Sequence, residues 1–173
     1  MYEDVAPIFK DLRRIKRAST AVGAAPEFIM GVITNSDDRV PSVLSSLGLD
    51  VGRRRYGLTE ETLDPRSDME DDIDFMVMSY DVGYEKPSRE IFDAAKQLVR
   101  SIWGNPDQED RFIHIGDDLK KDSEGAQRAG WESVLLDRDG EYDARGLRKA
   151  RALIVINDLR ELIHCLRINR QSS

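Results

Sequence analysis

Three groups of polar residues follow apolar runs of this sequence, and their side chains suit one kind of chemistry. Thr34 and Asn35 follow the first run, Lys86 lies in a loop after the second, and Asp117 and Asp118 follow the third. A threonine hydroxyl and a lysine ammonium can both donate hydrogen bonds to phosphate oxygens. Paired carboxylates are hard oxygen ligands of the kind that Mg2+ uses together with substrate phosphate and water. The residue types therefore predict a site for a phosphoryl group and a magnesium ion, where catalysis depends on positioning and charge stabilisation.

The apolar runs that carry these residues are predicted to be parallel strands. Such runs, apolar on both faces, are typical of strands covered by helices on each side; they lie at 28–33, 75–78, 111–115, 132–136 and 152–156. Helical patterns alternate with them, at 5–16, about 38–47, 88–102, 120–129 and 159–166. This alternation, without hairpin signals, predicts one α/β domain over residues 1–173 with a Rossmann-like, doubly wound parallel sheet. Because ligands of such sheets bind outside the carboxyl ends of the strands, the three polar groups are expected at one edge.

Three further features of the chain are predicted from local pattern. The second helix is expected to bury Val40, Val43, Leu44 and Leu47 and to end at Gly48. Residues 51–72 are rich in arginine and acidic residues and poor in apolar ones, so they are expected to be a mobile acidic insertion. Residues 168–173 are expected to be a flexible tail.

The composition limits the partners and the compartment. The net charge of −7 argues against general nucleic-acid binding. A basic cluster at Arg13, Arg14, Lys16 and Arg17 is interpreted as the solvated side of the first helix, with a targeting signal or RNA patch as the alternative. The chain has no apolar run of the ~20 residues that a membrane span needs and no signal-peptide pattern, which predicts a cytoplasmic or nuclear protein. The single cysteine, Cys165, excludes an intrachain disulfide and is expected to be a small buried hydrophobe.

Three motifs resemble those of the haloacid-dehalogenase-like (HAD) hydrolases, in the same order and at the same strand ends. Gly31–Asn35 resembles the second motif of that family, an apolar strand closed by Thr or Ser and Asn. Gly83–Pro87 resembles the third motif, a lysine loop, and Gly116–Asp122 resembles the fourth, the acidic metal motif. Each motif alone is a weak signal, but the three together make a specific resemblance that covers about residues 28–160.

The resemblance implies roles for the residues of the second and third motifs. Thr34 would bind the transferred phosphoryl group and Lys86 would neutralise its charge, so both would act in catalysis and in substrate binding. Asn35 would help to hold the phosphate loop. The implied substrate is a small phosphorylated molecule, and the lysine and metal motifs favour a phosphatase over a dehalogenase.

The fourth motif implies a magnesium cofactor. Asp117 would ligate Mg2+ with the assistance of Asp118, and Asp122 would support Lys86 or the metal shell. His114, which alternates inside an apolar strand, is interpreted as a packed core histidine.

The first motif of the family is missing from this chain. That motif is an Asp-x-Asp at the end of an apolar strand, whose first carboxylate attacks phosphorus and whose second is the general acid and base. The acids before residue 28 do not follow a strand, and Asp72-Ile73-Asp74 has the spacing but precedes a strand. We therefore expect the chain to be inactive alone, and interpret it as an N-terminally truncated member of the helical-cap subfamily.

Loss of that segment has a structural consequence and leaves several hypotheses open. In the family, the nucleophile's strand lies between the first and third strands found here, so two apolar strand edges are expected to be open and could support self-association. One hypothesis is a hydrolase chain that is active only with the missing segment. A second is a non-catalytic phosphate-binding or regulatory module. A response-regulator receiver domain is disfavoured because its acid pair should come first.

Overall fold

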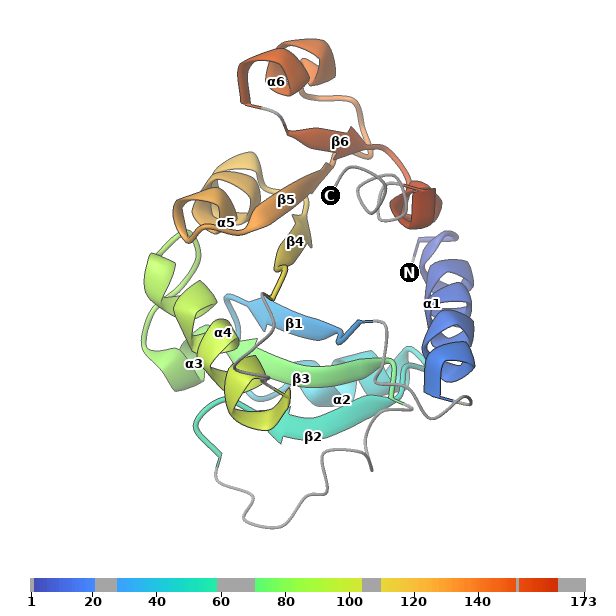
Figure 1. The fold of residues 1–173 in the computed structure, drawn as a ribbon, viewed down its shortest axis with the longest axis vertical. Helices are drawn as coiled ribbons and strands as arrows, with labels where there is room; N and C mark the ends of the chain where they lie inside the picture. Colours follow the sequence, from blue (N-terminus) through green and yellow to red (C-terminus); the bar gives the residue numbers. More distant parts are fainter. Residues whose placement is uncertain (1, 21–27, 59–70, 104–109, 152, 165–173) are drawn as a thin grey trace. The chain divides into compact units, whose positions relative to one another are not determined.

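The computed structural model describes residues 2–20, 28–58, 71–103, 110–151 and 153–164 (Figure 1). The chain divides into two compact units: the first comprises Phe9–Glu109 with Met1, and the second comprises Tyr2–Ile8 and Asp110–Ser173. Each unit contains a three-stranded parallel sheet. The predicted α/β class, with parallel strands and intervening helices, is confirmed. Among the described residues, no helix has the length and apolar character that crossing a bilayer requires.

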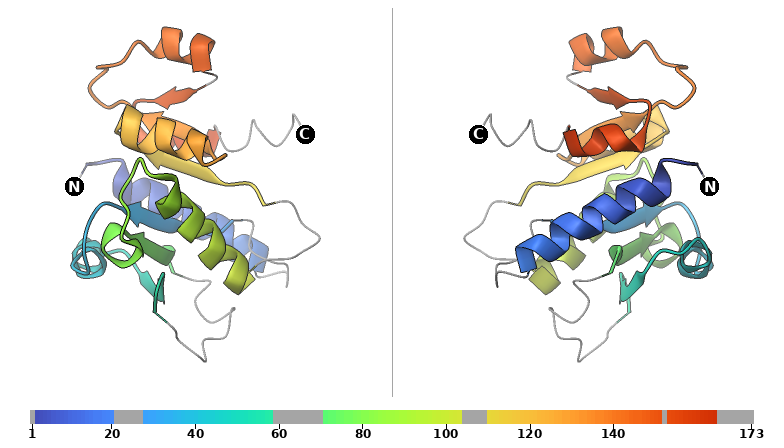
Figure 2. Two further views of the ribbon diagram at one scale, coloured as in Figure 1. Left: turned by 90° about the vertical axis from the view of Figure 1, so that its left-hand side faces the viewer. Right: turned by 90° about the vertical axis from the view of Figure 1, so that its right-hand side faces the viewer.

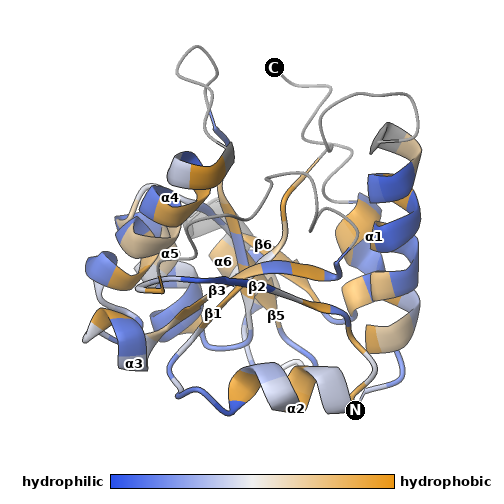
Figure 3. Cartoon of the chain, turned by 90° about the horizontal axis from the view of Figure 1, so that it is seen from below, coloured by the Kyte–Doolittle hydropathy of each residue, from blue (hydrophilic) through white to orange (hydrophobic). Residues whose placement is uncertain are grey.

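The first unit is built around a fully buried central strand. Its elements are α1 (Val5–Thr20, shared with the second unit), β1 (Gly31–Thr34), α2 (Val40–Ser46), β2 (Val51–Arg55), β3 (Ile73–Met78), α3 (Ser79–Val82) and α4 (Arg89–Trp103). Figure 1 shows β3 between β1 and β2, which is the strand order of this sheet. All six residues of β3 are buried, and α4 contacts both β3 and β1. The bands of orange and blue along α1 and α4 in Figure 3 reflect the amphipathic pattern that predicted both helices.

The second unit has the same plan on a smaller scale. Its elements are β4 (Ile113–Gly116), η1 (Leu119–Glu124), α5 (Gly125–Arg128), β5 (Glu132–Leu136), α6 (Ala144–Arg151), β6 (Ile154–Ile156) and η2 (Leu159–Glu161). The strand order is β4-β5-β6, and the core cluster of Leu135, Leu153 and Val155 lies under α6 residues such as Leu147. The predicted helix at 120–129 is a π-helical turn continued by an α-helical turn, and α6 was not predicted.

The prediction for α2 is wrong in one respect. The helix ends before Gly48, whose φ of 86° is the left-handed conformation that glycine adopts at helix ends. No residue of α2 is buried, and Val43 and Leu47 are 54% and 44% exposed. The apolar spacing predicted the helix correctly, but its contact with β2 leaves all of its described residues at least partly exposed.

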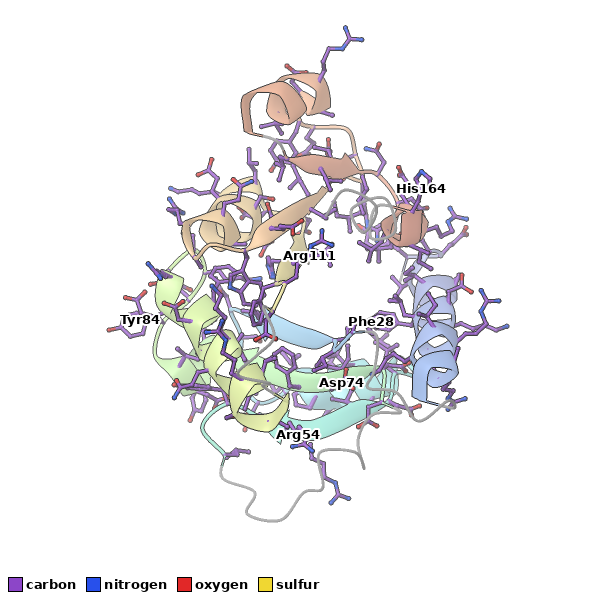
Figure 4. The ribbon with its side chains drawn as sticks, viewed as in Figure 1. Phe28, Arg54, Asp74, Tyr84, Arg111 and His164 are labelled. Atoms are coloured by element: carbon purple, nitrogen blue, oxygen red, sulfur yellow. The ribbon has the colours of Figure 1, made fainter. Side chains whose placement is uncertain are left out.

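The prediction of a mobile insertion over residues 51–72 is wrong for the ends of that segment. Val51–Arg55 is the edge strand β2, because its main chain pairs in parallel with β3 and two of its three arginines lie close to acidic side chains. Arg55 makes two 2.6 Å hydrogen bonds to Asp81, and Arg54 is 9% exposed and lies near Asp74 (Figure 4). Asp72 is buried beside β3. Residues 59–70, Cys165 and the predicted tail at 168–173 lie outside the described residues.

The basic residues of α1 do not form one solvated face. Figure 2 shows α1 as one continuous helix, and Lys16 on it is only 3% exposed. The Lys16 ammonium donates to Asp74 Oδ1 at 2.6 Å and to the Asp71 carbonyl at 2.7 Å. Arg13 donates from Nε to Asp72 Oδ1 at 2.9 Å and from Nη2 to Asp72 Oδ2. Two of the four basic residues thus bind α1 to the start of β3.

Within its own unit, each of the strands β1 and β4 has one described partner strand. β1 pairs only with β3, and β4 pairs only with β5, so each is the edge strand of its own sheet.

Candidate functional site

The residues of the second and third motifs meet in the first unit. Thr34 is the last residue of β1 and pairs with Met78, the last residue of β3. Asn35 follows Thr34, and its side-chain amide reaches the lysine loop between α3 and α4. Asn35 Nδ2 donates to the Lys86 carbonyl at 3.0 Å, and the Lys86 amide donates to Asn35 Oδ1 at 2.6 Å. Two residues 51 positions apart in the sequence are therefore joined by a reciprocal pair of hydrogen bonds.

This contact defines what Asn35 does. Both polar atoms of its amide bind the main chain of Lys86, so Asn35 holds the lysine loop against the end of β1. Ser36 extends the same junction, because its carbonyl accepts hydrogen bonds from the Tyr80 amide at 3.3 Å and the Ser79 hydroxyl at 3.4 Å. Asn35 therefore has a specific contact with the lysine loop that no local sequence pattern indicates, and its role in a phosphate loop stays a prediction.

The surroundings of the lysine loop are polar and open. Thr34, Asn35 and Lys86 are all partly exposed. Tyr84, two residues before Lys86, is 53% exposed and points outward from the unit in Figure 4. The nearby cation Arg55 is paired with Asp81, and this hydrogen bond raises the pKa of Arg55. The charge of Arg55 is therefore already balanced by a carboxylate.

The residues of the fourth motif lie together in the second unit. Asp117 is exposed just beyond the end of β4. Asp118 caps η1, since its Oδ1 accepts hydrogen bonds from the amides of Lys120 at 2.9 Å and Lys121 at 2.8 Å. Asp122 is 5% exposed, and its Oδ2 accepts a hydrogen bond from the Asp118 amide at 3.0 Å. Asp122 therefore contacts the main chain of the acidic loop directly.

His114 belongs to the same cluster, which sequence reasoning missed. The prediction of a buried histidine is correct, since His114 is 8% exposed on β4. Its Nε2 lies 3.0 Å from Asp122 Oδ1, so the histidine is hydrogen-bonded to the carboxylate that holds Asp118. The His114 ring also meets Trp131 edge-on, with a centroid separation of 6.5 Å. An alternating pattern identifies a buried histidine but not its partner on the following helix.

Gly116 is required by this arrangement. A Cβ built at Gly116 would lie 2.3 Å from Cγ and 2.4 Å from Oδ2 of Asp122. Real Cβ atoms do not approach other atoms this closely, so only glycine allows the Asp122 carboxylate to lie against the end of β4. The glycine of the acidic motif thus has a packing explanation.

Magnesium fits the donor chemistry of this loop in part. Among residues 2–20, 28–58, 71–103, 110–151 and 153–164, no group of three His, Cys, Asp or Glu side chains could hold a metal ion. Asp117 and Asp118 supply two carboxylates, and Asp118 is 42% exposed although Oδ1 is used as a helix cap. Mg2+ is commonly held by one or two carboxylates with water and substrate phosphate completing the shell. Two carboxylates of this kind are compatible with magnesium that is also bound by a phosphate.

The chain is similar in fold, and over part of its sequence, to one class of protein. The parallel α/β arrangement is that of the HAD-like hydrolases, and residues 83–162 match a family model described as HAD-hydrolase-like. The matched range contains the lysine loop and the acidic loop, and begins after Thr34 and Asn35. The family match covers less than half of the chain, and the solved structures show that the fold is similar to that of HAD-like hydrolases.

Individual proteins match this chain over part of its sequence or in fold. An uncharacterised hydrolase of Schizosaccharomyces pombe is 35% identical over 111 residues, which are 64% of this chain and 40% of that protein. A HAD phosphatase from Thermococcus onnurineus superposes with a TM-score of 0.62 at 20% identity, over 96% of this chain and 58% of the other. The HAD-hydrolase YfnB of Bacillus subtilis, bound to magnesium, gives 0.60 at 19% identity, over 95% and 54%. The chain thus spans 40% of the length of the first two curated relatives it matches.

Proposed function

We propose that this chain is the core of a HAD-like hydrolase of the phosphatase type, which binds a phosphoryl group and Mg2+ but does not turn over substrate alone. The observation that carries this proposal is the hydrogen-bonded junction of Asn35 and Lys86 beside Thr34. A lysine whose main chain is held at a strand end suits recognition of an anionic group at a fixed position. The match of residues 83–162 to a HAD-hydrolase-like family model supports the same conclusion.

The proposed binding step uses the chain's own donors. The Thr34 hydroxyl donates to one phosphoryl oxygen, and the Lys86 ammonium neutralises negative charge on the others. Asn35 is a positioning residue, because it fixes the main chain of Lys86. Asp117 and Asp118, in the second unit, would hold Mg2+, which would supply positive charge to a bound phosphate.

The proposed absence of turnover is supported by the surroundings of three carboxylates, those of Asp4, Asp72 and Asp74. Asp4 is 2% exposed, and its Oδ2 accepts hydrogen bonds from Arg138 and from the Leu159 amide, both at 2.8 Å. Asp72 and Asp74 are buried in ion pairs with Arg13 and Lys16. A nucleophilic carboxylate must reach phosphorus, and these three are engaged in packing contacts instead.

The finer assignments are also proposals. We place the chain in the helical-cap subfamily, where it resembles the haloacid dehalogenase-like hydrolase domain-containing protein 3, and in the cytoplasm or nucleus. Its ligand would be a small phosphorylated molecule rather than nucleic acid or membrane. Among the described strands, β1 pairs only with β3 and β4 only with β5. This pairing supports self-association, because the second edge of a parallel strand can accept a further strand.

A non-catalytic phosphate-binding or regulatory module is the second candidate. It is favoured by the fact that binding residues are held in place while Asp72 and Asp74 are both used in ion pairs. The two candidates predict the same binding and differ when the chain is joined to an Asp-x-Asp segment. Only the hydrolase candidate predicts turnover by the joined protein.

Phosphate binding to the purified chain tests the proposal. The amide resonances of Thr34, Asn35 and Lys86 are followed by NMR during titration with inorganic phosphate and Mg2+. We expect saturable shifts that Lys86→Met weakens by roughly 10- to 100-fold, the effect of one charge-assisted hydrogen bond. Lys10→Met, which removes an exposed lysine of α1, is the matched control and should have no effect. Equal binding by the two variants would contradict the proposed phosphate site.

A further inference from the structure

We propose that His114 and Asp122 form a positioning pair that fixes the acidic loop of Asp117 and Asp118 for cation binding. The inference rests on the proposed function, because it concerns the same loop. It assigns a functional role to His114, and it gives Asp122 a task different from direct support of a lysine. Neither residue is proposed to touch the cation.

The chain of contacts runs from the strand to the loop without interruption. His114 Nε2 lies 3.0 Å from Asp122 Oδ1, and Asp122 Oδ2 accepts the Asp118 amide hydrogen bond at 3.0 Å. The Asp122 amide in turn donates to the Asp118 carbonyl at 2.8 Å. Asp118 is therefore held by Asp122 on both sides of its main chain, and each oxygen of the Asp122 carboxylate has one of these partners.

Burial makes this arrangement stiff. His114 and Asp122 are 8% and 5% exposed, so neither group can replace its protein partner with bulk water at low cost. Gly116 lets the Asp122 carboxylate lie against β4, and the Trp131 ring limits the movement of the imidazole on another side. If the imidazole is removed, the carboxylate loses one of its two anchors and can turn away from the Asp118 amide.

The position of the loop matters for cation binding because its ligands are few. Asp118 already uses Oδ1 to cap η1, so the orientation of its remaining oxygen depends on the main-chain geometry of the loop. Asp117 is adjacent in sequence, and a rotation of the Asp118 peptide moves the Asp117 carboxylate as well. With two carboxylates rather than three, a small misplacement should weaken binding measurably.

A buried histidine in ordinary core packing would predict a different response to substitution. His114→Gln retains a side-chain N–H that can donate to Asp122, whereas His114→Leu fills the space without a donor. Ser133 provides a matched control, since it pairs with His114 in the β4–β5 register and is also buried. Its hydroxyl makes no hydrogen bond in the described structure, so Ser133→Ala removes a buried polar group of the same region and no contact to Asp122.

Two measurements on the full chain test the inference. Hydrogen exchange of the Asp118 amide reports the Asp122 contact directly, and Mn2+-induced broadening of the amide resonances of residues 117–121 reports cation binding. We expect His114→Leu to speed exchange and to weaken Mn2+ binding, each by roughly tenfold, the effect of one lost hydrogen bond. We expect His114→Gln to recover most of both effects, and Ser133→Ala to change neither.

Failure of this inference and failure of the proposed function give different results. If His114→Leu leaves exchange and Mn2+ binding unchanged in a folded chain, or if His114→Gln is as impaired as His114→Leu, the positioning role is overturned. If Mn2+ causes no broadening in the unsubstituted chain, the proposed cation site fails, and the positioning role for that site fails with it. In that case altered exchange in the His114→Leu chain would show only a structural contact.

Discussion

The chain has two pairs of aspartates at the ends of parallel strands, and their surroundings are opposite. Asp72 and Asp74 lie at the start of β3, with side chains 0% and 3% exposed, and each is bound by a cation from α1. Asp117 and Asp118 follow the end of β4, where Asp117 is exposed and Asp118 is 42% exposed. The first pair has the Asp-x-Asp spacing of a catalytic motif, whereas the second pair has the position of a ligand site.

The two pairs of aspartates differ in the end of the strand at which they lie and in the groups that contact their carboxylates. At the start of β3, the carboxylates accept hydrogen bonds from Arg13, Lys16 and the amides of Met30 and Asp50, so their charge joins α1 and the neighbouring loops to the sheet. After β4, a buried layer of His114 and Asp122 supports the loop and leaves the Asp117 carboxylate open. The spacing of the aspartates alone therefore does not identify the role of either pair. The burial of their carboxylates and the groups that contact them distinguish a packing role from a binding role.

Removing the cation that binds Asp74 should have the largest effect on stability. Lys16→Met leaves the Asp74 carboxylate buried without its ammonium partner, which typically costs about 3–5 kcal/mol. We expect urea denaturation followed by circular dichroism to show a loss of that size in the free energy of unfolding. Arg14→Met is the matched control on the same helix, because the Arg14 side chain is 78% exposed and its ion pair with Asp11 should contribute less than about 1 kcal/mol. Equal effects of the two variants would show that the Lys16–Asp74 pair is not a structural anchor.

Disturbing the contact by which Asp122 holds the loop of Asp117 and Asp118 should have an intermediate effect on stability. Gly116→Ala places a methyl group against the Asp122 carboxylate, and overpacking of this kind costs about 1–3 kcal/mol. We expect lower thermal stability together with faster hydrogen exchange at the Asp118 amide. Gly140→Ala is a useful comparison, because nothing lies within 4 Å of a Cβ there and only its φ of 68° opposes the change. Slow exchange at Asp118 in the Gly116→Ala chain would contradict the assigned contact.

Changing the second pair itself should hardly affect stability. Asp117→Asn removes the charge of an exposed carboxylate, and such substitutions usually alter the free energy of unfolding by less than about 0.5 kcal/mol. The same substitution should nevertheless weaken Mn2+ binding, since a neutral amide oxygen is a poorer ligand for a divalent cation. A large loss of stability in Asp117→Asn would mean that this carboxylate, like Asp74, has a structural task.

The pKa values of two buried or paired carboxylates, those of Asp74 and Asp158, provide a further test of how partners and burial act on aspartates. Burial raises the pKa of Asp74 above its usual value of 3.8, although Lys16 and the Met30 amide oppose this. The folded chain therefore holds the Asp74 proton more tightly than the unfolded chain does. The contribution of Asp74 to stability is greatest below pH 3.8 and is lost as the pH rises through the folded pKa.

Asp158 provides the reference for that titration. Its pKa is lowered to about 2 by hydrogen bonds from the Arg160 side chain and amide, so it should titrate on the other side of the usual value. We expect carboxyl 13C NMR to place the midpoint of Asp74 above that of Asp158. The reverse order would show that Lys16 outweighs burial at Asp74.

Much of the fold could be predicted because its signals are local. The run at 132–136 coincides with β5, and the helical spacing of apolar residues located α4 to within a residue or two. β2 was missed because its arginines conceal the strand pattern. Arg55 is accommodated by Asp81 and Arg54 lies near Asp74, whereas Arg53 is exposed. The exposed apolar side of α2 was missed because spacing shows that a helix is amphipathic but not whether another element covers it.

The candidate site was predictable in its residues and not in its contacts. Thr34, Lys86 and Asp117 could be placed at strand ends or in the loops that follow them, because apolar runs mark where strands stop. The reciprocal bonds between Asn35 and Lys86 join positions 51 residues apart, and no pattern within either motif specifies them. The pairing of His114 with Asp122 likewise depends on how η1 folds back against β4.

We propose that the chain binds phosphate and a cation but does not hydrolyse a phosphoester alone. The most direct test is hydrolysis of p-nitrophenyl phosphate by purified residues 1–173 with Mg2+, compared with Asp117→Ala and with circular dichroism to show folding. We expect the unsubstituted chain to hydrolyse the substrate no faster than the Asp117→Ala control. Hydrolysis that disappears in Asp117→Ala would contradict this proposal, because another carboxylate would then be serving as the nucleophile.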